Sequence, residues 1–408
     1  MADEARISDS TKEKAAAGPA PAPAPAISAP GMAVAPKGRD RRKWWIWVIL
    51  AVAVVNGGLT LLLFVYAIYE LGRPWHLGWQ PAGVRWADRT KMSVTGDDLN
   101  SVFAAGNGRR VWAVGGVDEI PAGNVIIESD DGGKTWSARK SGSSTDQLWG
   151  VFGTSDGKHL WAVGNEGTVL ESDDGGGSWI GRQSGTTADL RAIFSTSDGK
   201  HIWAVGGRGF DPSGEKNTGE IVESDDGGTS WTTRRDNAPG ILYSIFGSSD
   251  GRRLWAAGQL GTILESEDGG ATWVVRRSGD AHDTLQSIFG TGDGMHLWVP
   301  EPRAKILESS DGGATWTERD TGLEPPPPLT NKDAVLAAGF AAGDGRRVWL
   351  VGSVGAGEVV FESDDEGVTW KVRYSQYMPL FSMAGSSDGK HLWAVGEGGS
   401  ILESDSGW

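Results

Sequence analysis

Two short motifs alternate along most of the chain, and their spacing limits what it can fold into. One is an acidic nonamer such as ESDDGGKTW at 128–136, found in six full copies, with a seventh copy starting at 403. The other is a fifteen-residue motif such as GVFGTSDGKHLWAVG at 150–164, found in seven copies. Its central tryptophans are Trp112, Trp161, Trp203, Trp255, Trp298, Trp349 and Trp393. A period of about 40–50 residues is typical of propellers, arrays and solenoids.

Each unit resolves into four short strands, which we call a to d. In one unit they read LYSIFG, RRLWAAG, TILESE and TWVVRRS, and turns of Gly, Asp and Ser separate them. The strands are rich in β-branched and aromatic residues, and no stretch after residue 80 has sustained helical periodicity. The sequence therefore predicts an all-β fold over 83–408, a seven-bladed β-propeller of four-stranded blades.

The segment GVRWADRTKMS at 83–93 precedes the first strand a and is expected to be an outer strand d. Its Trp86 aligns with the tryptophan that ends each nonamer, and an arginine lies three residues after each of these tryptophans. These arginines are Arg89, Arg139, Arg182, Arg234, Arg276, Arg319 and Arg373. We expect this N-terminal strand to close the last blade and lock the ring, because closure removes exposed sheet edges.

The nonamer follows the pattern Ser-x-Asp-x-Gly-x-Thr/Ser-Trp, which predicts a tight hairpin between strands c and d. Aspartate accepts backbone N–H groups, glycine takes a positive φ, and tryptophan packs below the turn. A calcium loop is the alternative, although each copy lacks the further downstream carboxylate of a full oxygen cage. A glutamate precedes each box serine, and we expect it to face the arginine of strand d as a cross-strand pair. A ring of arginines that binds an acidic partner stays open as the functional alternative.

The first 82 residues differ in kind from the repeats. Residues 1–43 form an Ala/Pro-rich segment that is expected to be disordered, and it ends in a basic cluster. Residues 44–69 carry no formal charge and are long enough for a single transmembrane helix, and 70–82 follow as a linker. This apolar stretch is longer than that of a cleaved signal peptide. The basic cluster predicts a cytoplasmic N-terminus and a periplasmic or extracellular propeller.

Composition argues against several classes of function. The formal charge of −15 repels nucleic acid, and the absence of cysteine excludes a thiolate metal site. A sialidase needs a tyrosine nucleophile, but the propeller offers only Tyr243, Tyr374 and Tyr377, and the repeat spaces its arginines evenly. Four histidines share one repeat position with Arg110, Arg253 and Arg347, which indicates a surface turn. We therefore predict no catalytic residue, no metal and no cofactor.

The boxes joined to the WAVG and GTILES segments, as at 203–231 and 255–273, resemble a known pattern. They look like Asp-box, or bacterial neuraminidase, repeats, and the whole of 83–408 resembles the propellers of the photosystem II assembly and stability factor family. That resemblance implies a membrane-associated, non-enzymatic helper that holds membrane-protein intermediates. The chain departs from the family in its Ala/Pro tail and its own apolar span, and a photosystem client is not implied.

Residues that bind a partner are expected where units break the pattern. The breaks are inserts at 117–124, 207–219 and 322–334 and the segment VPEPRAK at 299–305. All are b–c or d–a connections, which emerge on one face of a propeller, and loops on a rigid scaffold commonly carry recognition. The candidate contacts are Asp118, Glu119, Arg208, Phe210, Asp211, Glu215, Lys216, Arg303 and Lys305. The sequence predicts a membrane-anchored propeller that docks to, assembles or stabilises a membrane-protein complex. A carbohydrate- or cell-wall-binding module is the alternative.

Overall fold

The structure is a computed structural model, and the fold is described for part of the chain. It covers residues 86–117, 123–139, 146–209, 217–279, 283–322, 334–354, 357–376 and 378–405. All of these belong to one unit of the chain, Arg73–Trp408. The predicted tail, span and linker lie outside the described residues. Within the described part, no helix is both long enough and apolar enough to cross a membrane.

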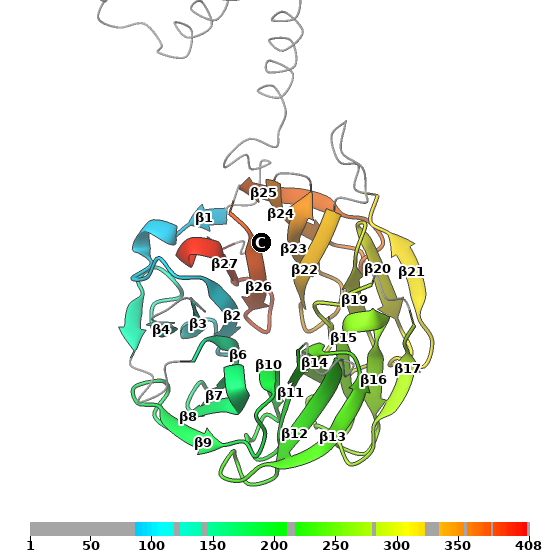
Figure 1. Ribbon diagram of the computed structural model, residues 1–408. Helices are drawn as coiled ribbons and strands as arrows, with labels where there is room; N and C mark the ends of the chain where they lie inside the picture. Colours follow the sequence, from blue (N-terminus) through cyan, green and yellow to red (C-terminus); the bar gives the residue numbers. More distant parts are fainter. Residues whose placement is uncertain are drawn as a thin grey trace, which may run out of the picture. The chain divides into compact units, whose positions relative to one another are not determined.

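Seven four-stranded antiparallel sheets surround a common centre (Figure 1). Blade one consists of β2 (Leu99–Ala104), β3 (Val111–Val117), β4 (Gly123–Ser129) and β5 (Ser137–Arg139). Blade two consists of β6 (Leu148–Gly153), β7 (Leu160–Gly164), β8 (Thr168–Ser172) and β9 (Ile180–Gln183). Blade three consists of β10 (Asp189–Ser195), β11 (Ile202–Arg208), β12 (Thr218–Ser224) and β13 (Thr232–Pro239). Blade four consists of β14 (Leu242–Gly247), β15 (Leu254–Gly258), β16 (Ile263–Ser266) and β17 (Val274–Arg277). Blade five consists of β18 (Phe289–Gly290), β19 (Leu297–Glu301), β20 (Lys305–Ser309) and β21 (Thr317–Asp320). Blade six consists of β22 (Ala334–Ala341), β23 (Val348–Val354), β24 (Gly357–Ser363) and β25 (Lys371–Gln376). Blade seven is β26 (Leu380–Gly385), β27 (Leu392–Gly396), β28 (Ile401–Ser404) and β1 (Trp86–Asp88). The prediction of an all-β propeller with seven four-stranded blades is confirmed.

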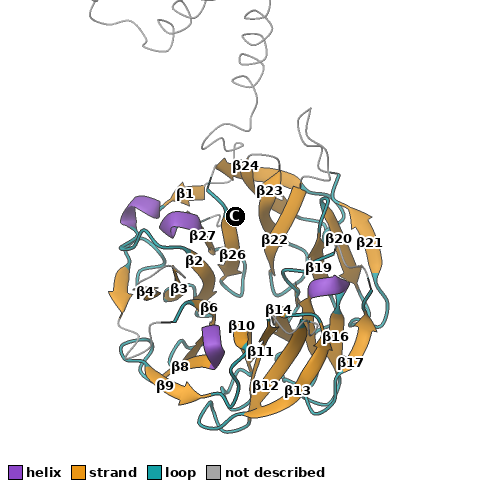
Figure 2. Cartoon of the chain, in the orientation of Figure 1, coloured by secondary structure: helices purple, strands orange, loops and turns teal. Residues whose placement is uncertain are grey.

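The helical turns of Figure 2 are short 3-10 segments in the connections. They are η1 (Thr90–Met92), η2 (Asn165–Gly167), η3 (Gln259–Gly261) and η5 (Glu397–Gly399). The last three are b–c connections, and in two of them a non-glycine residue takes a positive φ, 53° at Glu166 and 58° at Leu260.

The fourth strand of blade seven comes from the other end of the described chain. Strand β1 pairs antiparallel with β28, with Trp86 opposite Ser404 and Asp88 opposite Leu402. The strand expected over 83–93 is shorter in the structure, because Thr90 N donates to the Asp88 carboxylate and the chain turns into η1. Residues 83–85 lie outside the described residues.

The core is divided into seven apolar clusters, one between each pair of neighbouring blades. Between blades one and two, for example, Trp112 packs with Leu148 and Leu160, and all three are fully buried. Trp86 belongs to the cluster between blades six and seven, together with Trp349 and Tyr374. Each blade is thus stabilised chiefly by its neighbours, since a single twisted sheet cannot bury both of its faces.

The nonamers form the predicted hairpin turns, and their hydrogen bonds show why these residues are used. In the second copy, Ser172 Oγ accepts from Gly176 N at 2.8 Å and donates to Asp174 Oδ1 at 2.9 Å. Both Asp174 oxygens are also bound by Ser178, by its N–H at 2.9 Å and by its hydroxyl at 2.8 Å. These bonds hold the pKa of Asp174 down at about 2. The aspartate therefore acts as the acceptor that shapes the turn.

The two repeated motifs meet across six of the seven blade boundaries in the described part of the chain. The indole N–H of Trp112 in blade one donates to Gly175 O in the box of blade two at 3.2 Å. Gly176 lies at φ 91°, and a Cβ there would be 2.6 Å from the same indole nitrogen. The strand-b tryptophan of one blade therefore needs the second glycine of the next box, which explains why both motifs recur together. In the box of blade six, Glu366 replaces the first glycine with a φ of 65°, and its carbonyl accepts from the Trp298 indole at 3.3 Å.

The predicted pairing of seven glutamates with seven arginines is confirmed. Each glutamate is at the end of strand c, and each arginine lies diagonally across in or just after strand d. The pairs are Glu128–Arg139, Glu171–Arg182, Glu223–Arg234, Glu265–Arg276, Glu308–Arg319, Glu362–Arg373 and Glu403–Arg89. Each arginine is bound to a glutamate within the ring, and six of these seven glutamates are buried. These ion pairs therefore favour the structural interpretation over an acidic-partner site.

Candidate functional site

One position of the inner strand differs in every blade. A buried leucine that all seven units share, such as Leu99 or Leu148, lies near the start of strand a, and the residue after it is never repeated. These residues are Asn100, Trp149, Arg191, Tyr243, Gln286, Ala337 and Phe381, and we call them the variable ring. In a chain whose other positions obey the repeat so closely, this position is free of the constraints of the scaffold.

The backbone turns the variable ring towards the centre of the molecule. In six of the seven sheets, the register between strands a and b shifts at this residue, as between Leu99 and Ser101 in blade one. Such β-bulges redirect a side chain and are common next to functional sites. The inner strands β2, β6, β10, β14, β22 and β26 surround the centre (Figure 1).

The whole variable ring lines one cavity of about 590 Å³, so that every blade contributes to its wall. The other lining residues lie at the start of strand a or at the b–c ends of blade six, and they are Asp98, Gln147, Val335, Ser353, Glu358, Pro379 and Leu380. The cavity therefore opens on the face that carries the b–c and d–a connections. Its volume is within the range of pockets that take a peptide side chain or a small ligand.

One side of the cavity, formed by blades two and three, is held rigidly. The Arg191 guanidinium lies 4.1 Å from the centre of the Trp149 ring, a cation–π contact. Arg191 Nη2 is 2.9 Å from an Asp189 carboxylate oxygen, and the Trp149 indole donates to Asn165 Oδ1 at 2.6 Å. The positive charge of Arg191 is thus already partnered within the protein.

The other side, formed by blades six and seven, is apolar and acidic. Val335, Phe381 and the nearby Met378 are 49%, 37% and 42% exposed. Beside them Glu358 is buried, and burial raises its pKa to about 7, while the Leu380 N–H opposes the shift and the charge of Glu397 adds to it. The cavity is therefore asymmetric, although the scaffold around it repeats seven times.

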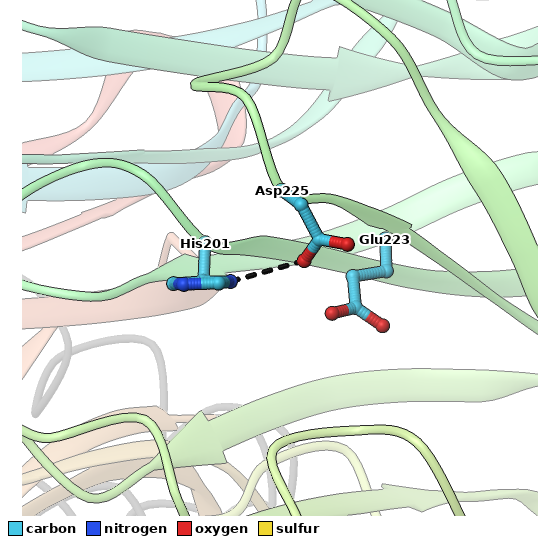
Figure 3. Close-up of side chains that lie close together, drawn as sticks. All are labelled: His201, Glu223 and Asp225. Carbon is cyan, nitrogen blue, oxygen red and sulfur yellow. Dashed lines mark hydrogen bonds and ion pairs between the residues drawn. The ribbon is translucent and has the colours of Figure 1, made fainter.

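A second cluster lies on the opposite, Asp-box face and consists of His201, Glu223 and Asp225 (Figure 3). Their ligand atoms lie within 4.8 Å of one another, and His201 Nδ1 is 3.0 Å from Asp225 Oδ1. However, Arg234 binds Glu223 at 2.6 Å, and the same histidine–aspartate contact recurs at His159 and His391. The cluster therefore follows from the repeated turn, as the shared histidine position predicts.

Three of the candidate contacts from the sequence fall within the described residues. Arg208 ends β11 in blade three and lies 3.9 Å from Glu220. Arg303 lies in the b–c connection of blade five with a φ of 70°, and Lys305 begins strand β20, where it is paired with Glu318. The structure places these residues on two separate blades, and none of them lines the central cavity. Asp118, Glu119, Phe210, Asp211, Glu215 and Lys216 lie outside the described residues.

The variable ring was not among the residues predicted from the sequence, because the expected contacts were sought only in irregular loops. The signal was present inside a regular strand, as a column of the repeat in which no two units agree. Aligning the seven copies of strand a and asking which position varies would have found it. Glu358 has no such signal, because its significance depends on which side chains surround it.

Comparison with known proteins supports the fold. The BNR/Asp-box repeat model matches residues 127–138, and no curated protein matches the chain. A solved structure of YCF48 bound to D1 peptide is 19% identical, with a TM-score of 0.58 over 79% of this chain and 97% of that chain. YCF48 from Cyanidioschyzon merolae is 16% identical, with a TM-score of 0.59 over 78% of this chain and 98% of that chain.

A glycoside hydrolase is similar in the same way. The GH74 enzyme of Niastella koreensis is 13% identical, with a TM-score of 0.58 over 76% of this chain and 53% of the enzyme. At these identities the likenesses concern the fold alone. The resemblance to propellers of the photosystem II assembly factor type, with an Asp-box repeat, is confirmed at that level.

Proposed function

We propose that this propeller is a non-catalytic docking module that holds a segment of a membrane-protein complex during its assembly or stabilisation. The observation that carries the proposal is the variable ring, in which all seven blades present a different side chain to one cavity. A scaffold that repeats everywhere else gains an asymmetric recognition surface there. Exposed apolar groups on a surface commonly mark a site of protein interaction.

Two further observations support a membrane-protein partner. A propeller of the same fold, YCF48, has been solved bound to D1 peptide. In addition, the uncharged stretch 44–69 follows a basic cluster, and we propose that it anchors the propeller on the periplasmic or extracellular side of a membrane. The predicted contacts Arg208, Arg303 and Lys305 lie on the face where the cavity opens and would extend the docking surface.

The test is capture of a complex by the full chain. Membranes that contain the tagged protein are solubilised in mild detergent and separated on a native gel, and co-migrating proteins are identified by mass spectrometry. We expect one defined membrane-protein complex to co-migrate with the wild-type chain and to be lost with a Trp149→Ala/Phe381→Ser double variant. Migration of the wild type as a lone species would overturn the proposal. Ile180→Ser, an exposed change on an outer strand, is the matched control.

Glycan binding is the second candidate, and aromatic and amide side chains that line the cavity support it. Trp149, Tyr243 and Phe381 offer aromatic faces, and the amides of Asn100 and Gln286 offer donors and acceptors. A glycan-array signal that Trp149→Ala removes, without any co-migrating membrane protein, would replace the docking proposal. Hydrolysis of a glycoside that Tyr243→Phe abolishes would overturn its non-catalytic part.

A further inference from the structure

Among the buried glutamates of the described residues, one lacks the arginine neighbour that the others have. Nine glutamates are buried among the described residues, and in eight of them an arginine nitrogen lies within 4 Å of the carboxylate. The ninth is Glu358, which has no cationic side chain within that distance in the described part of the chain. It is also the only one of the nine that lines the central cavity.

The surroundings of Glu358 leave its charge unbalanced. Its described partner is the backbone N–H of Leu380, and the charge of Glu397 acts against ionisation. A buried carboxylate without a counter-ion is costly, so the group tends to stay neutral until a cation approaches. Arg191 also lines the cavity but is not the counter-ion of Glu358, because it belongs to blade three and is already bound to Asp189 and stacked on Trp149.

The neighbours of Glu358 suit the stem of a long basic side chain. Across the sheet of blade six, Glu358 lies opposite Ser353, and Ser353 lies opposite Val335, so the three form a row along the cavity wall. Val335 and Phe381 each expose more than a third of their surface there. Lysine and arginine bury an apolar stem and keep the charge at its tip. A phenyl ring beside that tip adds a cation–π attraction.

We propose that the segment docked in the cavity carries a lysine or arginine, whose stem packs on Val335 and Phe381 and whose charge binds Glu358. This inference rests on the proposed docking function and names the chemistry of the partner. The partner is therefore a peptide segment with a basic residue, and this residue binds on the acidic side of the cavity.

The experiment uses the full chain in detergent and a library of acetylated, amidated hexapeptides, which have no terminal charges. Peptides retained by the immobilised wild type are sequenced by mass spectrometry. We expect lysine and arginine to be enriched about tenfold or more, the effect of a hydrogen bond to a charged group. Glu358→Gln should abolish the enrichment, and Glu166→Gln, a change of an exposed glutamate on the same face, should keep it. Acetylation of the lysine in a retained peptide should reduce its binding to the wild type by the same factor.

The outcomes separate this inference from the proposed function. Retention of peptides without a basic preference, or with a preference that Glu358→Gln leaves intact, overturns the basic-residue assignment and leaves docking standing. Retention of no peptide also overturns this inference, whereas the docking function is decided independently by co-migration of the complex. Thermal unfolding of Glu358→Gln shows whether a loss of peptide binding comes from misfolding of the variant. The weaker binding of acetylated peptides is measured on the wild type, so it does not depend on that variant.

Discussion

Individual carboxylates in this protein are stabilised in opposite ways, and Glu358 gives the clearest prediction. Its pKa is raised from 4.5 to about 7, so the folded protein keeps a proton that the unfolded chain has lost. Stability should therefore fall as pH rises from about 4.5 through 7. Relative to Glu358→Gln, the wild type should be less stable at pH 8 than at pH 5 by up to about 3 kcal/mol. Urea unfolding at the two pH values measures this difference.

The groups that share the cavity with Glu358 sharpen this test. Asp98, Arg191 and Tyr243 line it, and Glu397 lies nearby, but no histidine lines the cavity. Glu362→Gln is the matched control, since Arg373 lies 2.5 Å from that carboxylate. It should destabilise the protein at both pH values, because it leaves Arg373 without its partner. If Glu358→Gln also destabilised the protein at both pH values, the statement that Glu358 is buried without a counter-ion would be wrong.

The second glycine of an Asp box gives a prediction about sterics. Gly228 has a φ of 97°, and a Cβ there would lie 2.6 Å from the Trp161 indole nitrogen of the preceding blade. Gly228→Ala should therefore lower the free energy of unfolding by about 2 kcal/mol or more, from backbone strain and overpacking together. Gly181→Ala is the control, because a Cβ at that exposed strand position meets nothing within 4 Å. Denaturant midpoints of the two variants should differ clearly, and equal midpoints would show that the blade contact adapts at no cost.

At the scale of the element, the box turn depends on an ionised aspartate. The pKa values of Asp174, Asp226 and Asp311 are lowered from 3.8 to about 2 by hydrogen bonds from the serine or threonine hydroxyl and N–H groups of the same turn. A lowered pKa gives stability that is complete above about 4 and is lost as the pH falls towards 2. We expect cooperative acid unfolding in that window, followed by tryptophan fluorescence. Asp174→Asn should be less stable than the wild type at pH 7, and this gap should narrow towards pH 2.

The same turns show what the sequence could and could not predict. Blade number, strand order and the Glu–Arg pairs were predictable because each feature occurs seven times, so that a chance resemblance in one unit is corrected by the others. Strand limits were less certain, as at 90–92, where the Asp88 side chain captures the Thr90 N–H and ends the strand. The variable position can be found in the sequence, but its orientation towards one cavity could not be predicted, because a β-bulge at Trp149 or Phe381 appears only as a shift of register between paired strands.

At the scale of the whole molecule, a regular scaffold surrounds an irregular centre. Seven equivalent interfaces hold the blades, so a change at the variable ring costs little in packing between blades. The ring can therefore differ at each blade, with Arg191 on one side of the cavity and Phe381 on the other. A ligand that meets seven different side chains is bound in one orientation, which suits the recognition of a peptide segment better than that of a symmetric ligand.

Where the ring closes, β1 is the one strand of its sheet that comes from the opposite end of the described chain. A chain that begins at residue 95 loses the buried Trp86 and the Arg89–Glu403 ion pair, whereas one that begins at 83 keeps both. Loss of the tryptophan alone should cost about 3–5 kcal/mol. Loss of β1 would also expose the edge of β28, which could then pair with a strand of another molecule. We expect the shorter chain to melt at a lower temperature and to form oligomers in light scattering. A monomer with unchanged melting would show that β1 does not lock the ring.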